Sequence, residues 1–320
     1  MEVKEQIENF LKRRPDTVCT YGYGSGVFKQ AGYTDEDKPQ IDLILAVKDI
    51  KKWHLENIKM NPSDYSIIGK IFYSNASRET IKGFNGIAYQ SNIRDYTWYL
   101  ALNSRYSDGA ETEIECKVQM FKYGVIEYSD LEKQLKTWNR FYLAGRFQKG
   151  ILPIKSTKEI DSLIEENRKD ALVAALYFLG KESTLTELYE TIVSLSYIGD
   201  TRMKFFENPN KIRNIVSKLK DELDYIYKKK NPYFEIVDDE KIIVNHQILN
   251  KEFLPASLAY YLSGIPKDNL EAIRQAIYNF FKEKNKKESL NQTIHGIKTN
   301  GIVNSSDYVF QKIKKRIYKK

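Results

Sequence analysis

The chain has 320 residues, of which 42% are hydrophobic and 29% charged, a composition that fits a folded protein of two domains and excludes a disordered or fibrous one. The longest uninterrupted apolar run, Ala171–Leu179, has nine residues, less than half of the ~20 that a membrane-spanning helix needs. The N-terminal residues lack the apolar core of a secretory signal, so we expect a cytoplasmic protein.

The net charge of +8 comes from one end of the chain. Residues 282–320 hold eleven Lys and Arg residues and three acidic ones, which leaves the remainder neutral. A neutral body with a basic tail favours docking on an anionic surface over a basic cleft that wraps nucleic acid. We therefore expect no nucleic-acid partner.

The residues that usually hold transition metals are few and scattered. The two cysteines, Cys19 and Cys116, do not form a CxxC pair, and the three histidines do not form an HExxH motif. A bound metal would therefore need carboxylate ligands.

The first chemically informative segment is a glycine cluster, YGYGSGVF (21–28), directly after an expected strand around Val18. The cluster lacks the third glycine of a dinucleotide fingerprint and the Gly-Lys-Ser/Thr of a P-loop. What remains is a Gly-Ser turn, in which Gly24 and Gly26 would let the backbone approach a phosphate and Ser25 would donate a hydrogen bond. An ordinary tight turn is the alternative.

The next strand, IDLILAV (41–47), contains one charged residue, Asp42. A carboxylate there would be satisfied by Mg²⁺ bound to a nucleoside triphosphate, because this ion takes oxygen ligands from one or two carboxylates together with phosphates. A strand-end cap is the alternative. A Gly-Ser turn on one strand and an Asp on the next is the layout of the nucleotidyltransferase superfamily, with Asp42 and Ser25 as candidate catalytic residues.

Further along, residues 113–120 alternate between polar and apolar side chains, which predicts a half-buried strand. Residues 129–148 have helical spacing, and the first domain should end near residue 152. Helical patterns over 157–231, followed by two short strands in 233–246, predict a winged-helix-like domain over 153–254. Residues 255–320 should form a C-terminal helical segment.

Six blocks along the chain resemble one family within that superfamily, the mitochondrial-type phosphatidate cytidylyltransferases. The blocks are YGSGVFKQ (23–30), KPQIDLILAV (38–47), WHLENIKMNPSDYS (53–66), FKYGVI (121–126), LAGRFQKG (143–150) and SLNQTIHGIKTNGI (289–302). The resemblance implies an α+β fold with a nucleotidyltransferase domain, a winged-helix domain and a C-terminal segment that associates peripherally with membrane. It also implies Mg²⁺ as cofactor and CTP and phosphatidic acid as substrates.

The blocks supply further candidate residues. FKYGVI adds Lys122 as a catalytic cation and Tyr123 as a nucleotide contact. Cationic side chains are needed because the reaction brings two anions together. The other candidates for binding phosphate or substrate are His54, Asn57, Arg146 and Lys149. Surface solvation is the alternative for Lys122, Arg146 and Lys149, and a helix cap is the alternative for Asn57.

Three positions depart from the family pattern. Many nucleotidyltransferases carry a second acid two residues after the first, but Ile44 occupies that position here. A second metal ligand would then come from the alternating strand, with Glu115 or Glu113 as the candidate and a solvated strand face as the alternative. Asp64 and His295 stand where the family usually has His and Lys.

The basic tail is the candidate membrane contact. In residues 307–320 the apolar side chains fall on one helical face and basic ones on the rest, so the helix should dock reversibly at the inner face of an anionic membrane. The docking residues are Val309, Phe310, Ile313, Lys314, Lys315, Arg316 and Ile317. A terminal helix packed on its own protein is the alternative.

Two other functions fit parts of this pattern. A nucleotidyltransferase acting on RNA or protein would share the Gly-Ser turn and Asp42. A winged-helix nucleic-acid-binding protein would explain the basic tail but would leave those two features without a role.

Overall fold

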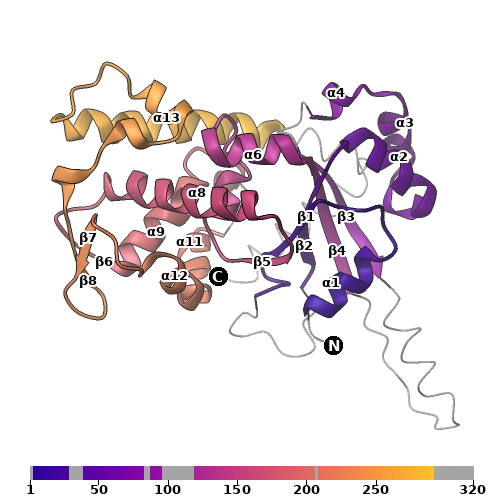
Figure 1. Cartoon of the computed structure of the whole chain (residues 1–320), viewed down its shortest axis with the longest axis horizontal. Helices are drawn as coiled ribbons and strands as arrows, with labels where there is room; N and C mark the ends of the chain where they lie inside the picture. The colour runs from indigo at the N-terminus through magenta and orange to yellow at the C-terminus, as the bar shows by residue number, and fades with distance from the viewer. Residues whose placement is uncertain (1–2, 29–38, 83–86, 96–118, 206–207, 292–320) are drawn as a thin grey trace, which may run out of the picture. The chain divides into compact units, whose positions relative to one another are not determined.

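The computed structural model describes residues 3–28, 39–82, 87–95, 119–205 and 208–291, with the side chains of 87–95 and 204–205 excepted. These residues divide into two compact units. The first contains the described residues up to Tyr128 together with Ile151–Thr157, and the second contains Ser129–Gly150 and residues 158–291. Each unit holds a β-sheet and several helices (Figure 1), which confirms the α+β class.

The first unit is organised around a five-stranded sheet with the order β3-β4-β2-β1-β5. The strands are β1 (Cys19–Tyr23), β2 (Ile41–Val47), β3 (Ile87–Asp95), β4 (Gln119–Glu127) and β5 (Ile151–Lys155). The pair β2–β4 is parallel, and the pairs β1–β2, β1–β5 and β3–β4 are antiparallel. The central strand β2 is therefore flanked by β1, which leads into the glycine turn, and by β4.

Helices cover one face of this sheet. They are α1 (Val3–Leu11), α2 (Ile50–Met60), the short η1 (Pro62–Asp64), α3 (Ile67–Asn75) and α4 (Arg78–Lys82). Local sequence sets where two of them begin, because Asp49 caps α2 by accepting from Lys52 N and Ser66 caps α3 by accepting from Gly69 N. Alternate residues of the strands form the core with these helices, including Ile41, Leu43, Leu45, Val47, Phe121, Tyr123 and Val125.

The second unit is mainly helical. Its helices are α6 (Tyr128–Thr137), α7 (Ala144–Phe147), α8 (Lys158–Leu176), α9 (Leu185–Leu195), α10 (Thr201–Phe205), α11 (Lys211–Lys218), α12 (Lys220–Tyr227), η2 (His246–Ile248), η3 (Lys251–Phe253), α13 (Ala256–Tyr261) and a long helix over 270–291. The continuous helix expected over 129–148 is instead split into α6 and α7. Trp138 follows α6 with a φ of 51°, a conformation that cannot continue a right-handed helix.

A three-stranded antiparallel sheet with the order β6-β8-β7 completes this unit. Its strands are β6 (Glu182–Thr184), β7 (Phe234–Ile236) and β8 (Lys241–Val244). The pairing of β7 with β8 confirms the hairpin predicted in 233–246. Thr184 also begins α9 with a capping box in which Glu187 reaches back to the Thr184 backbone N–H.

Some predictions fall on parts of the chain that are not described. The alternating segment 113–120 is described only from Gln119, where β4 begins, and both Glu115 and the tail 307–320 lie outside the described residues. The three-domain division at residues 152 and 254 stays a prediction. Within the described ranges, no helix combines the length and hydropathy that crossing a bilayer requires.

Candidate active site

The glycine turn is shorter than expected, because β1 continues through Tyr23 and leaves residues 24–28 to turn. The backbone N–H groups of Val27 and Phe28 both donate to Gly24 O, at 3.2 and 3.1 Å. Gly24 has a φ of +76°, which favours glycine. A Cβ on Gly26 would lie 2.3 Å from Gln40 O, so the turn packs directly against the residue that precedes β2.

Asp42 lies beside this turn. In the sheet register it is opposite Tyr23 of β1 and next to Lys122 of β4, so the three side chains share one face. Its Oδ1 is 3.9 Å from Lys122 Nζ, and a Cβ on Gly24 would lie 3.1 Å from its Oδ2. The two charged side chains are 23% and 21% exposed. The carboxylate is thus held between a backbone turn and a cation while staying accessible to a ligand.

The sheet register brings Asp42 and Lys122 together from two strands, and the turn after β1 adds the predicted site residues Gly24, Ser25 and Gly26. Ser25 is partly buried in the turn itself. Sequence reasoning missed Tyr23, which lies on the same face of the sheet as Asp42. The alternation of side chains along the strand CTYGY could have predicted that position.

Tyr123, the residue after Lys122, points to the opposite face and is fully buried. Its hydroxyl donates to Asp64 Oδ2 at 2.7 Å and accepts from Asn57 Nδ2 at 2.7 Å. Asp64 also accepts from Arg14 Nη2 at 2.8 Å, and Asn57 donates to Tyr65 Oη at 2.9 Å. Burial raises the pKa of Tyr123 well above its ordinary value, so its hydroxyl keeps the proton that it donates.

His54 belongs to the same buried network. Its Nδ1 lies 2.9 Å from Tyr65 Oη, and its ring stacks on Tyr73 with 4.0 Å between centroids. These contacts of His54, Asn57 and Tyr123 are all with protein groups on the helix-covered face of the sheet, so they organise the core. Contact of these three residues with nucleotide or substrate stays a prediction.

Arg146 and Lys149 lie in the second unit and line the same pocket, together with Ser196, Tyr197, Asp200, Arg202 and Glu288. Lys149 is 6% exposed, and its Nζ donates to Ser196 Oγ at 2.6 Å and lies 4.7 Å from the Tyr197 ring centroid. Burial lowers the pKa of Lys149 to about 8, the phenol of Tyr197 opposes that shift, and the charge of Arg146 adds to it. Phosphate binding by this pair stays a prediction.

Asp42 is the predicted metal ligand that lies within the described residues. Among the residues that the structure describes, no group of three or more His, Cys, Asp or Glu side chains is arranged to hold an ion. One accessible carboxylate beside a turn that leaves room at Gly24 nevertheless fits Mg²⁺, because that ion usually takes one or two carboxylates and completes its shell with phosphates and water.

Comparison with known proteins identifies the family. The profile described as "Phosphatidate cytidylyltransferase, mitochondrial" matches residues 7–288. The protein of that name in Schizosaccharomyces pombe is 33% identical, over all of this chain and 85% of its own length. The protein of that name in Dictyostelium discoideum is 36% identical, over 74% of this chain and 54% of its own length. The relative of that name in Saccharomyces cerevisiae is 32% identical, over 91% of this chain and 65% of its own length. The chain therefore belongs to the mitochondrial-type phosphatidate cytidylyltransferases, a family of nucleotidyltransferase enzymes.

Proposed function

We propose that the protein transfers the cytidylyl group of CTP to phosphatidic acid, releasing pyrophosphate and forming CDP-diacylglycerol. The observation that carries this proposal is the position of Asp42 between the Gly24–Gly26 turn and Lys122, in a chain that belongs to this family. In the reaction, a phosphate oxygen of phosphatidic acid forms a bond to the α-phosphorus of CTP, and the bond between that phosphorus and the pyrophosphate oxygen breaks.

The site suits a reaction between two anions. The phosphate nucleophile is already ionised at neutral pH, so a strong general base is less necessary than for a hydroxyl nucleophile. The main barrier is charge repulsion, which Lys122 would reduce from one side while Ser25 and the turn backbone hold the triphosphate. Mg²⁺, when bound to Asp42 and the phosphates, would supply the remaining positive charge.

The topology of each unit supports its predicted fold. A Gly-Ser turn after one strand and an Asp on the neighbouring central strand agree with a nucleotidyltransferase domain in the first unit. In the second unit, β6 precedes the helices α9, α11 and α12, and the hairpin β7–β8 then pairs with β6 through β8. That order of strands and helices supports a winged-helix module.

The lipid substrate implies action at a membrane surface. The basic tail 307–320 is our proposed docking element there, at the inner face of an anionic membrane. The cytoplasmic location stays a prediction, and the relatives are named as mitochondrial enzymes.

One feature of the proposed winged helix disfavours a nucleic-acid substrate. The tip of the β7–β8 hairpin carries Asp238, Asp239 and Glu240. Three acids at a wing tip would repel a phosphate backbone.

The proposal is tested with purified protein, labelled CTP, Mg²⁺ and phosphatidic acid. We expect wild-type protein to form CDP-diacylglycerol and Asp42→Asn to lower the rate about 1,000-fold, because the substitution removes the carboxylate that would hold the metal. Asp16→Asn is the matched control, since Asp16 is an exposed acid of the same unit. The proposal is wrong if wild-type protein forms no lipid product or if Asp42→Asn retains the full rate. The same assay with RNA or protein in place of phosphatidic acid tests the alternative, a nucleotidyltransferase that acts on one of those acceptors.

A further inference from the structure

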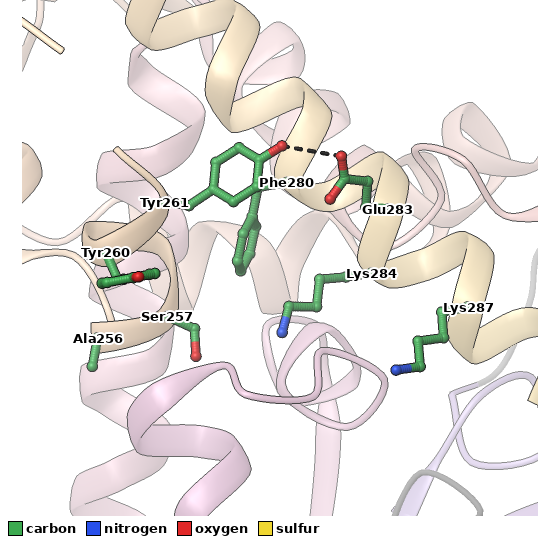
Figure 2. A pocket seen from close by; sticks show the side chains of 8 residues that line it. All are labelled: Ala256, Ser257, Tyr260, Tyr261, Phe280, Glu283, Lys284 and Lys287. Carbon is green, nitrogen blue, oxygen red and sulfur yellow. Dashed lines mark hydrogen bonds between the residues drawn. The ribbon is translucent and has the colours of Figure 1, made fainter. Parts of the chain in front are cut away.

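The second unit contains a groove between α13 and the helix over 270–291, with a volume of about 570 Å³. Figure 2 shows the side chains that line it, among them Ser257, Tyr260, Tyr261, Phe280, Lys284 and Lys287. None of these residues belongs to the proposed reaction site.

The apolar part of the groove is aromatic. Phe280 is buried and meets Tyr261 edge to face, with 5.7 Å between ring centroids. Tyr260, on the rim, is 82% exposed, and Phe253 of η3, close to it in the chain, is also 82% exposed. Exposed aromatic side chains beside an apolar groove are typical of interaction surfaces, and tyrosine in particular suits the boundary between water and lipid.

The cationic part comes from the long helix. Lys284 and Lys287 are three residues apart and therefore neighbours on one helix face. Lys284 Nζ donates to Asn139 O at 2.8 Å and lies 5.4 Å from the Phe280 ring centroid. Burial lowers the pKa of Lys284, Glu288 opposes that shift, and Lys287 adds to it. A negative charge at this point would therefore stabilise the ammonium groups.

The one acid that lines the groove is paired with a tyrosine. Glu283 accepts a hydrogen bond from Tyr261 Oη at 3.1 Å. Figure 2 shows its carboxylate directed toward that ring, while the two lysine ammonium groups lie away from this carboxylate. The groove thus presents an aromatic wall and a separate positive end.

We propose that this groove and its exposed aromatic rim are a docking surface for a bilayer that contains anionic phospholipid. Lipid phosphates would contact Lys284 and Lys287, and Tyr260 and Phe253 would enter the interfacial layer. A purely apolar ligand would make no use of the two ammonium groups, and free phosphate would not use the aromatic wall, whereas an anionic lipid uses both. The inference rests on the proposed function in one respect, namely that the substrate lies in a bilayer. The docking surface does not include the basic tail 307–320.

The test measures co-sedimentation of the full chain with vesicles of phosphatidylcholine alone, or of phosphatidylcholine mixed with phosphatidylglycerol or with phosphatidic acid. The test variant combines Phe253→Ala, Tyr260→Ala and Lys287→Ala, all at exposed positions. We expect its affinity for both kinds of anionic vesicle to fall about 10-fold or more, since each basic residue near an anionic surface contributes about 5-fold. The same substitutions are repeated with Lys314→Gln, Lys315→Gln and Arg316→Gln so that the tail cannot mask the loss.

The matched control combines Tyr225→Ala with Lys230→Ala, because Tyr225 is 76% exposed and Lys230 is exposed elsewhere on the same unit. Unchanged vesicle binding by the test variant, or an equal loss in the control, would overturn the proposal. So would binding by wild-type protein that is equally tight on pure phosphatidylcholine. Activity on a short-chain, monomeric phosphatidic acid is measured in parallel and should be the same in the test variant and wild type. If wild-type protein has no such activity, the proposed function fails while the vesicle comparison still decides the docking surface.

Discussion

Lys122 and Tyr123 are adjacent in β4 but serve opposite faces of the sheet. Lys122 lies beside Asp42 on a face that leaves both side chains partly exposed, whereas Tyr123 is sealed in a network with Asp64 and Asn57. The period of two along a strand separates these environments. The comparison teaches that one short motif can place a candidate catalytic cation and a structural hydrogen bond side by side in the sequence.

Substituting Lys122 tests the partly exposed face most directly. We expect Lys122→Gln to lower kcat/KM for CTP about 100-fold to 1,000-fold, because it removes a positive charge next to Asp42. The free energy of unfolding should change by less than about 1 kcal/mol, since the ion pair is long and partly exposed. Steady-state kinetics and urea unfolding measure the two quantities. A large stability loss with normal kinetics would show that Lys122 is structural.

Substituting Tyr123 tests the buried face. Tyr123→Phe removes two buried hydrogen bonds, one to Asp64 and one from Asn57, so the free energy of unfolding should fall by about 2–3 kcal/mol. At a temperature where the variant is folded, kcat should stay within about 3-fold of wild type. A strong rise in KM for CTP without loss of stability would instead support the predicted contact of Tyr123 with nucleotide.

Gly24→Ala sharpens the comparison at the turn, and Gly264→Ala is its matched control. Both glycines have positive φ, +76° and +81°, so each substitution carries a similar backbone cost of about 1 kcal/mol. Only at Gly24 would the new Cβ lie 3.1 Å from Asp42 Oδ2, whereas no atom lies within 4 Å at Gly264. We expect Gly24→Ala to lower activity about 10-fold and Gly264→Ala to leave it unchanged. Equal activities of the two variants would show that the turn does not position Asp42.

The smallest expected effect concerns Lys149 in the second unit. Its pKa of about 8 in the folded state is below its ordinary value of 10.5, so the unfolded chain binds more protons between these values and stability rises with pH there. From about pH 7 to about pH 9, the free energy of unfolding of wild type relative to Lys149→Met should rise by about 1 kcal/mol. Urea unfolding at several pH values measures this difference. A difference that stays constant over this range would mean that Lys149 keeps an ordinary pKa in the folded protein.

Local sequence was a good guide where local chemistry decides the structure. The turn after β1, the strand around Asp42 and the β7–β8 hairpin were all predictable from glycine positions, strand-forming residues and an acidic turn. It was a poor guide at Trp138, because helical spacing continues through that residue while its positive φ ends α6. The Trp138 indole is held there by Asn167, 29 residues away, at 2.8 Å.

The sequence by itself determined the Gly-Ser turn and the strand that carries Asp42, since each depends on residues close together in the chain, and the family resemblance added the α+β class. Only the tertiary structure decided which neighbours those residues meet. Asp42 and Lys122 are 80 residues apart and become adjacent through the parallel pairing of β2 with β4. Arg14, Asp64 and Tyr123 likewise form one buried network from three distant segments. Strand order and register, which depend on contacts across the whole unit, place those residues together.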